Sequence, residues 1–150
     1  MSRSTVRGGN RLRRKLRRLP AVITAAVTDV IVKAASEVHA EASRNMPVPG
    51  SHPYATGELQ RKFRLFVSKD GMRARVGSWG KRRSRHIHLV EFGAAPHDIP
   101  MPDGGVIHHP GAPAQPFLLP AWQKARARFR VELRQAVGRA LARESGGDAS

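Results

Sequence analysis

An apolar stripe with the spacing of an α-helix runs through the first third of this chain and restricts the folds open to it. Its members recur every three or four residues, which places them on one helix face: Leu12, Leu16, Leu19, Ile23, Val27, Val30, Ala34 and Val38. Pro20 interrupts the stripe, and proline costs about 3 kcal/mol in a helix interior but is tolerated in the first turn. We therefore predict a short basic helix or turn over Asn10–Arg18 and a main helix over Leu19–Arg44, ended by Pro47.

A second stripe predicts a helix near the other end of the chain. Its members again share one face: Trp122, Ala125, Phe129, Leu133, Val137 and Ala140. Pro116 and Pro120 bracket an apolar run and hold it in a fixed arrangement, with Pro120 in the first turn of the helix. We interpret Phe117 in that run as a core residue, and a direct partner contact is the alternative. The polar residues 145–150 are predicted to form a disordered tail.

Three shorter segments between these helices have the character of strands. Apolar residues alternate through Leu59–Val67, a turn follows at Lys69-Asp70-Gly71, and a second strand returns through Ala74 and Val76. His86–Phe92 is apolar on both faces and predicts a third, buried strand. The predicted fold class is α+β: a long N-terminal helix and a C-terminal helix packed on a small, mainly antiparallel sheet of three to five strands. Residues 19–144 would form its single domain.

The segment Ala94–Ala114 is long for a connection inside a compact domain. It contains five prolines and three glycines, and loops of this length are usually functional or disordered. Asp103-Gly104-Gly105 could close a small hairpin between Ile99–Met101 and Val106–His108. Such a hairpin could grip a neighbouring subunit, and a mobile surface loop is the alternative.

Positive charge is the dominant bulk property of the chain. The formal net charge is +16, and eight of the 27 Lys and Arg residues fall within the first 18 positions, where no acid occurs. We predict that residues 1–18 form a basic arm, with four more cations crowded into Lys81–Arg85. Such charge favours an anionic partner, either DNA, RNA, an anionic membrane or an acidic protein surface. Alternatively, the charge only keeps the chain soluble before assembly.

Composition limits the other possibilities. The chain has few aromatic residues and many alanines, so its core should be thin and neighbouring subunits should complete the burial. It contains no cysteine, which excludes disulfides and thiolate metal sites. The basic N-terminus has no apolar region typical of a secretory signal. The apolar run Ala21–Ile31 is expected to be too short and too polar to cross a bilayer, so no membrane partner is predicted.

Three motifs occur in a fixed order along the chain. They are Thr56-Gly57-Glu58-Leu59, Val90-Glu91-Phe92-Gly93 and Pro116-Phe117-Leu118-Leu119-Pro120-Ala121. Their order and spacing resemble the neck or tail-completion morphogenesis proteins of long-tailed phages, a family related to the lambda-type minor tail protein Z. The likeness extends from about Leu16 to about Arg128, which is most of the chain.

This resemblance implies a structural virion protein of the head–tail junction and not an enzyme. The family forms rings, most often sixfold, around the DNA channel. The expected partners are copies of the chain itself, the adjoining neck and tail-tube proteins and, through nonspecific contact, packaged DNA. The expected location is the virion, with the host cytoplasm during assembly. The motif residues expected to serve assembly or the core are Gly57, Leu59, Val90, Glu91, Phe92, Gly93, Pro116, Phe117 and Pro120.

Histidines suggest an alternative chemistry. Five of the seven lie between His86 and His109, with Glu91 and Asp98 nearby, and His86 and His88 would share one strand face as two possible metal ligands. However, no ligand signature such as His-Glu-x-x-His is present, and no nucleophile elbow or phosphate loop occurs. We therefore predict no catalytic residue, no metal and no cofactor. For Glu91 we expect a salt bridge with an arginine, within or between subunits, or else a position facing water at the rim.

Nonspecific nucleic-acid binding is the alternative function. The basic arm and the Trp79 loop would provide phosphate contacts and a stacking ring, although no recognisable DNA-reading motif is present. The residues expected to make electrostatic contacts are Arg11, Arg13, Arg14, Lys15, Arg82 and Arg83.

Overall fold

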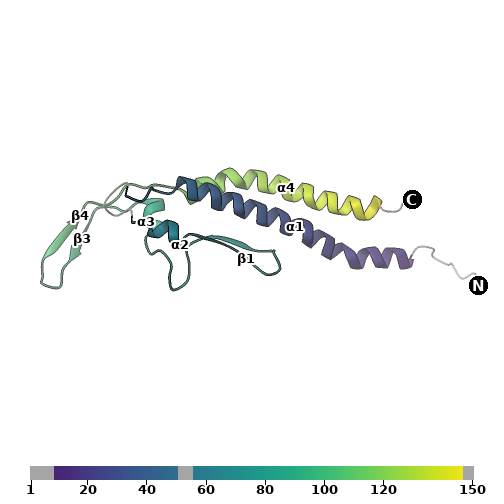
Figure 1. Ribbon diagram of the computed structural model, residues 1–150, viewed down its shortest axis with the longest axis horizontal. Coiled ribbons are helices and arrows are strands. Elements are labelled where there is room, and N and C mark those ends of the chain that lie inside the picture. The colour runs from purple at the N-terminus through teal and green to yellow at the C-terminus, as the bar shows by residue number, and fades with distance from the viewer. Residues whose placement is uncertain (1–8, 51–55, 147–150) are drawn as a thin grey trace, which may run out of the picture.

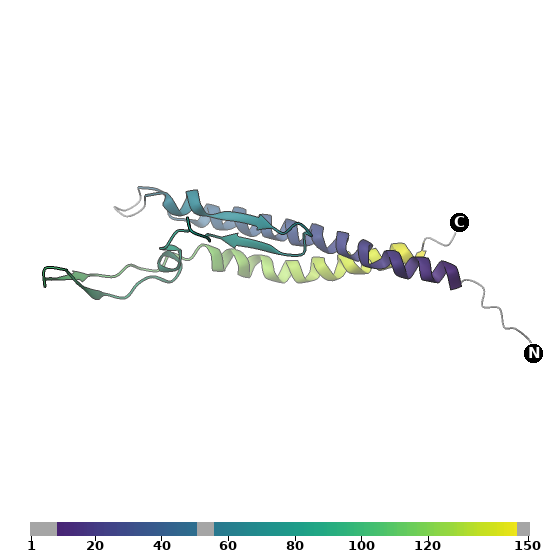
Figure 2. The ribbon, with the colours of Figure 1, turned by 90° about the horizontal axis from the view of Figure 1, so that it is seen from below.

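Two long antiparallel helices form the body of the molecule. The structure is a computed structural model that describes residues 9–50 and 56–146, with side chains described from Arg17 onward. Helices α1 (Gly9–Asn45) and α4 (Leu118–Gly146) lie side by side along its long axis (Figure 1, Figure 2). The elements between them lie along one side and at one end of this pair. The predicted α+β class is confirmed.

Helix α1 passes through Pro20 without a break, so the predicted division into two helices is wrong. Proline has no N–H group to bond the carbonyl group four residues earlier in the helix. Because Pro20 is exposed, water can bond that carbonyl group instead. Of the predicted basic arm, residues 9–18 belong to α1 and residues 1–8 lie outside the described residues. Of the predicted tail, Ser145 and Gly146 close α4, and 147–150 lie outside that range as well.

Alanines line the seam between α1 and α4. The buried alanines come from both helices: Ala34 and Ala42 from α1, and Ala121, Ala125, Ala136 and Ala140 from α4. Alanine favours the helix and lets two helix backbones approach closely. It also removes little apolar area from water, and each Å² removed stabilises the fold by only about 25 cal/mol. The core along this seam is therefore thin.

A short helix and a hairpin follow α1 along the chain. The predicted strand over Leu59–Val67 begins instead as helix α2 (Glu58–Lys62) and continues as β1 (Arg64–Val67). Strand β1 pairs antiparallel with β2 (Ala74–Gly77), and this hairpin lies along α1 (Figure 2). Its turn contains Gly71 with φ +66°, where a Cβ atom would collide with the Thr28 side chain of α1. A glycine is therefore required for the turn to reach the helix.

The predicted third strand over His86–Phe92 is wrong, because Ile87–Phe92 form helix α3. A short apolar run has no periodicity that separates a strand from a helix turn. In α3 the more buried residues Val90 and Glu91 follow Ile87 by three and four positions, as on one helix face, and Phe92 is exposed. A single sheet of three to five strands does not form: the strands of the described residues make two separate two-stranded sheets.

The second of these sheets is a projecting hairpin inside the segment 94–114. It consists of β3 (His97–Pro100) and β4 (Val106–His109), with His97 opposite His109 and Pro100 opposite Val106. The hairpin extends from the end of the helix pair, away from the rest of the molecule (Figure 1, Figure 2). Its strand residues are exposed except His109, which is half-buried.

The buried core lies at the end of the helix pair where α2 and α3 meet it. Its members come from both long helices and from the residues beside them: Val38, Ala42, Met46, Phe63, Phe117, Ala121 and Ala125. The Phe117 side chain is fully buried, with its ring edge against Phe63 at a centroid distance of 5.7 Å. Phe63 also stacks on His39 at 5.2 Å. These three rings fix how β1 and α4 sit on α1.

The apolar part of α1 is longer than the run Ala21–Ile31. By length and composition, Arg17–Asn45 could cross a membrane, with a mean hydropathy of 1.5 over one 18-residue window. This segment is longer than the run Ala21–Ile31, on which the expectation of no membrane span was based. Core helices of soluble proteins meet the same criterion, and α1 packs against α4 and both strands of the β1–β2 hairpin. Only 17% of that window is buried. The residues of α1 that serve the packing are Val30, Ala34, Val38 and Ala42.

We expect Phe117→Ala to be among the most destabilising single substitutions in the chain. Removing a fully buried phenylalanine leaves a cavity and typically costs 3–5 kcal/mol, which is a large share of a small domain's stability. Phe66→Ala is the matched control, because Phe66 is 54% exposed. Urea unfolding followed by circular dichroism measures both free energies. Equal losses in the two variants would contradict this assignment of the core.

Candidate functional site

A buried carboxylate joins two of the three sequence motifs. Glu91 of α3 is only 7% exposed, and its two oxygens accept backbone hydrogen bonds from the start of α4. Oε2 accepts from the amides of Phe117 and Leu118, both at 3.0 Å, and Oε1 accepts from Leu119 at 2.7 Å. The Arg partner expected within the subunit and the alternative position facing water are thus both wrong: Glu91 is buried and its partners are main-chain N–H groups.

These contacts account for every donor at the start of α4. The first N–H groups of a helix have no partner within the helix and are usually bonded by a nearby Ser, Thr, Asp or Asn side chain. The residues directly before α4 are Gln115, Pro116 and Phe117, and none of them is of these types. Glu91 replaces such a cap from 26 residues away, and the next residue, Pro120, has no N–H to bond. The negative charge also suits the positive end of the helix dipole.

Gly93 allows the chain to turn back toward the same helix start. Its φ is +77°, and a Cβ atom there would lie 2.8 Å from the Ala112 carbonyl oxygen. Directly beside it, Ala94 and Ala112 exchange two backbone hydrogen bonds of 2.9 Å, and the Gln115 amide donates to Val90 at 2.8 Å. The second motif therefore both caps α4 and holds the segment that leads into it.

The first motif approaches the same core from the other side. Gly57 is buried, has φ +72° and accepts from the Arg61 amide at 3.2 Å, which begins α2. Leu59, the second residue of α2, packs against the core cluster, as do Val90 and Leu118. The structure thus brings parts of all three motifs together around one core. It leaves Pro116 and Pro120 exposed, and Phe92 is 71% exposed.

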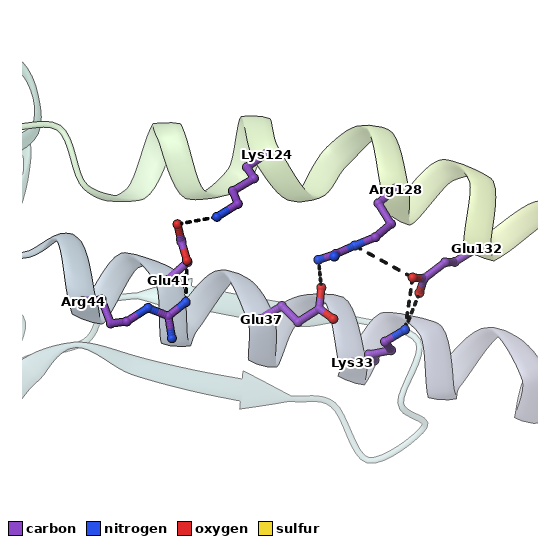
Figure 3. A network of polar contacts seen from close by, with 7 residues as sticks. All are labelled: Lys33, Glu37, Glu41, Arg44, Lys124, Arg128 and Glu132. Carbon is purple, nitrogen blue, oxygen red and sulfur yellow. Dashed lines mark hydrogen bonds and ion pairs between the residues drawn. The ribbon is translucent and has the colours of Figure 1, made fainter.

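A ladder of ion pairs along α1 and α4 was not anticipated from the sequence (Figure 3). Glu41 accepts from Lys124 at 2.9 Å and also pairs with Arg44, while Glu37 pairs with Arg128. Glu132 accepts from Lys33 at 3.0 Å. The sequence does carry a signal for this ladder. Charged residues recur every four positions on one face of α1 and on one face of α4. When the two helices lie antiparallel, acids of one helix face cations of the other.

The ladder lowers the pKa of one of its carboxyl groups. The hydrogen bond from Lys124, and then that from Arg44, holds the pKa of Glu41 below its ordinary value of about 4.5. Because the pairs are exposed to solvent, we assign them mainly to the register of the helices.

A cation-rich loop surrounds Trp79. The Arg64 guanidinium lies 4.7 Å from the centre of the indole ring and that of Arg75 lies 5.7 Å from it. The predicted contact residues Arg82 and Arg83 are exposed and follow in the same loop. The other predicted contact residues, Arg11, Arg13, Arg14 and Lys15, lie in α1 but outside the described side chains.

The histidines do not assemble into a metal centre within the described residues. His97 and His109 stack across the β3–β4 hairpin at 5.0 Å, and His108 contacts Asp98 at 2.7 Å. His86 and His88 do not share a strand face, because they lie at the start of α3. In the part of the chain that the structure describes, no three His, Cys, Asp or Glu side chains are placed to hold a metal ion.

The fold and its capped core define a structural module built to hold two helices and a hairpin in fixed relation. A family model described as "Bacteriophage HK97-gp10, putative tail-component" matches residues 10–93, more than half of the 150 residues. The chain therefore belongs to the HK97-gp10-like family of phage tail components. Neither the curated proteins nor the solved structures searched contain a match. The match includes the first two motifs and ends at Gly93, so Glu91 lies within it and its α4 partners lie outside.

We expect Glu91→Gln to destabilise the fold by about 1–3 kcal/mol. A neutral amide offers one acceptor oxygen in place of two, and hydrogen bonds to charged groups are worth more than those to neutral ones. Glu58→Gln is the control, because Glu58 pairs, among the described residues, only with the Lys62 side chain and is half-buried. Urea unfolding gives both values. A Glu91→Gln loss no larger than that of the control would refute the capping role.

We expect the Glu41 ion pairs to stabilise the fold at neutral pH and to fail in acid. The folded pKa lies below the ordinary value, so the contribution is complete above about pH 4.5 and disappears as pH falls through the folded pKa. Glu41→Gln should therefore lower the melting temperature at pH 7 and have little effect at pH 3. Glu144→Gln serves as the control. A Glu41→Gln effect independent of pH would count against an electrostatic contribution.

Proposed function

We propose that this chain forms an oligomeric ring at the phage head–tail junction, as a neck protein or a tail terminator. The ring would join the tail tube to the head and surround the DNA channel. Membership in a family of tail components supports a structural role in the virion. The proposed role requires neither catalysis nor a cofactor.

The observation that carries the proposal is the apolar surface at one end of the molecule. Phe92 is 71% exposed beside the projecting hairpin, and on the hairpin Val106 is 64% and Ile107 51% exposed. Val106 and Ile107 are adjacent in β4, so they lie on opposite faces of the hairpin. Apolar side chains exposed on both faces of a projecting element favour burial against other proteins. We assign that burial to the neighbouring copy in the ring. The thin Ala-rich seam of each subunit gives further reason for subunits to complete one another's core.

We expect Val106→Asp combined with Ile107→Asp to prevent ring assembly while leaving the subunit folded. Both side chains are exposed, so charges there cost the monomer little, but a charge buried in a subunit contact is strongly unfavourable. Val131→Asp is the matched control: Val131 is equally exposed, at 51%, but lies on α4. Phage lacking its own copy of the gene is complemented with each variant, and the particles are imaged.

The expected result is joined particles with Val131→Asp and unjoined heads and tails with the hairpin variant. In the joined particle, neighbouring copies should share more than about 1,000 Å² of buried surface. Copies that touch over a smaller area, or joined particles made by the hairpin variant, would sink the proposed contact. A particle in which the chain lies away from the head–tail junction would overturn the proposed position.

Nonspecific nucleic-acid binding as the main role is the second candidate. The exposed cations around Trp79 favour it. A protein with that role alone would be absent from purified virions, so quantitative mass spectrometry of virions separates the two.

A further inference from the structure

The chain separates its charges in space. Between Asp70 and Glu91 it contains six Lys and Arg residues and no acid. Glu91 bonds the start of α4, and the acids of the helix seam pair with cations of the seam itself. Within the described residues, no ion pair involves the cations that surround Trp79. These cations, here called the Trp79 surface, are Arg64, Arg75, Lys81, Arg82, Arg83 and Arg85.

Contacts hold Arg64 of β1 over Trp79 and close the backbone of the loop that carries Arg82, Arg83 and Arg85. Arg64 donates to the Trp79 carbonyl oxygen at 2.6 Å while its guanidinium lies over the indole ring. The Ser84 amide donates to the Ser78 hydroxyl at 2.7 Å, and Ser84 is buried. A run of cations that served only solubility would need no such order. A preorganised set loses less conformational entropy when a ligand binds.

An open cleft of about 370 Å³ includes two cations of this surface, Arg83 and Arg85. It is lined by Ser78, Arg83, Ser84, Arg85, Ile87 and His88. Two guanidinium groups and two hydroxyls offer hydrogen-bond donors, and the planar guanidinium fork matches the oxygens of a phosphate. The cleft contains no carboxylate that would repel an anion.

We propose that the Trp79 surface binds the phosphate backbone of double-stranded DNA. An interface with a protein usually has an apolar centre depleted of charge, and here the centre is cationic. The indole ring is already covered by guanidinium groups, so it cannot serve as the free stacking platform that single strands need. The inference rests on the proposed function, because a ring around the channel would bring duplex DNA to its subunits.

The test compares two triple variants with the same change in charge. One carries Arg82→Gln, Arg83→Gln and Arg85→Gln. The other carries Arg126→Gln, Arg130→Gln and Arg134→Gln, three exposed residues on α4. The full-length proteins bind a labelled DNA duplex of random sequence, and anisotropy gives the affinity at several salt concentrations. Each phosphate contact contributes about 0.9 to the slope of log affinity against log salt.

The expected result is a loss of at least tenfold in affinity and of about 2.7 in slope, three contacts at about 0.9 each, for the loop variant alone. Equal losses in both variants would mean that only the net charge matters and would overturn the proposal. Unchanged DNA binding with lost binding of poly-glutamate would assign the surface to an acidic protein instead.

A direct probe and an assembly control complete the test. In a Trp122→Phe background, Trp79 is the one tryptophan left, so duplex DNA should change its fluorescence at low salt and not at high salt. No change at either salt concentration would overturn the proposal. Incorporation of each variant into virions is measured separately. Ring-forming particles made by a loop variant with normal DNA affinity would refute this inference and leave the proposed function intact.

Discussion

The contact between Glu91 and the start of α4 is the interaction on which the arrangement of the other elements depends. Three amide hydrogen bonds from Phe117, Leu118 and Leu119 converge on one buried carboxylate. They place α4 relative to α3, and they place Phe117 inside the core against Phe63. Without this carboxylate, the buried amides at the helix start would have no partner, which costs more than the bond itself contributes.

Because of this contact, the two ends of the molecule are packed differently. At the capped end, aromatic rings and apolar side chains from α1, α2 and α4 make a compact core. Along the rest of the seam, small alanines and exposed ion pairs set the register of α1 and α4 (Figure 3). The projecting hairpin and Phe92 lie at the capped end, so the surface proposed for assembly is attached to the most firmly packed part of the subunit.

The sequence predicted the elements whose signals are periodic. Both helices were found from apolar stripes, and the first hairpin from alternating residues and a turn glycine. The second hairpin was one of two alternatives, suggested by the turn Asp103-Gly104-Gly105. The errors arose where local rules compete with tertiary contacts. An exposed Pro20 was accommodated inside α1, and α3 was mistaken for a strand because six residues carry no decisive period. The role of Glu91 could not be predicted, since its partners are backbone groups 26 to 28 residues away.

The uneven packing of the helix pair also sets the order in which the subunit can open. The cluster at the capped end joins residues of α1, α2, β2, α3 and α4, whereas the opposite end has only the thin seam between α1 and α4. Segments with few buried contacts unfold locally at lower free energy than the core. The distal turns of α1 and α4 can therefore separate while the capped end stays closed. The far ends of the two long helices are therefore the part of the subunit that we expect to open first.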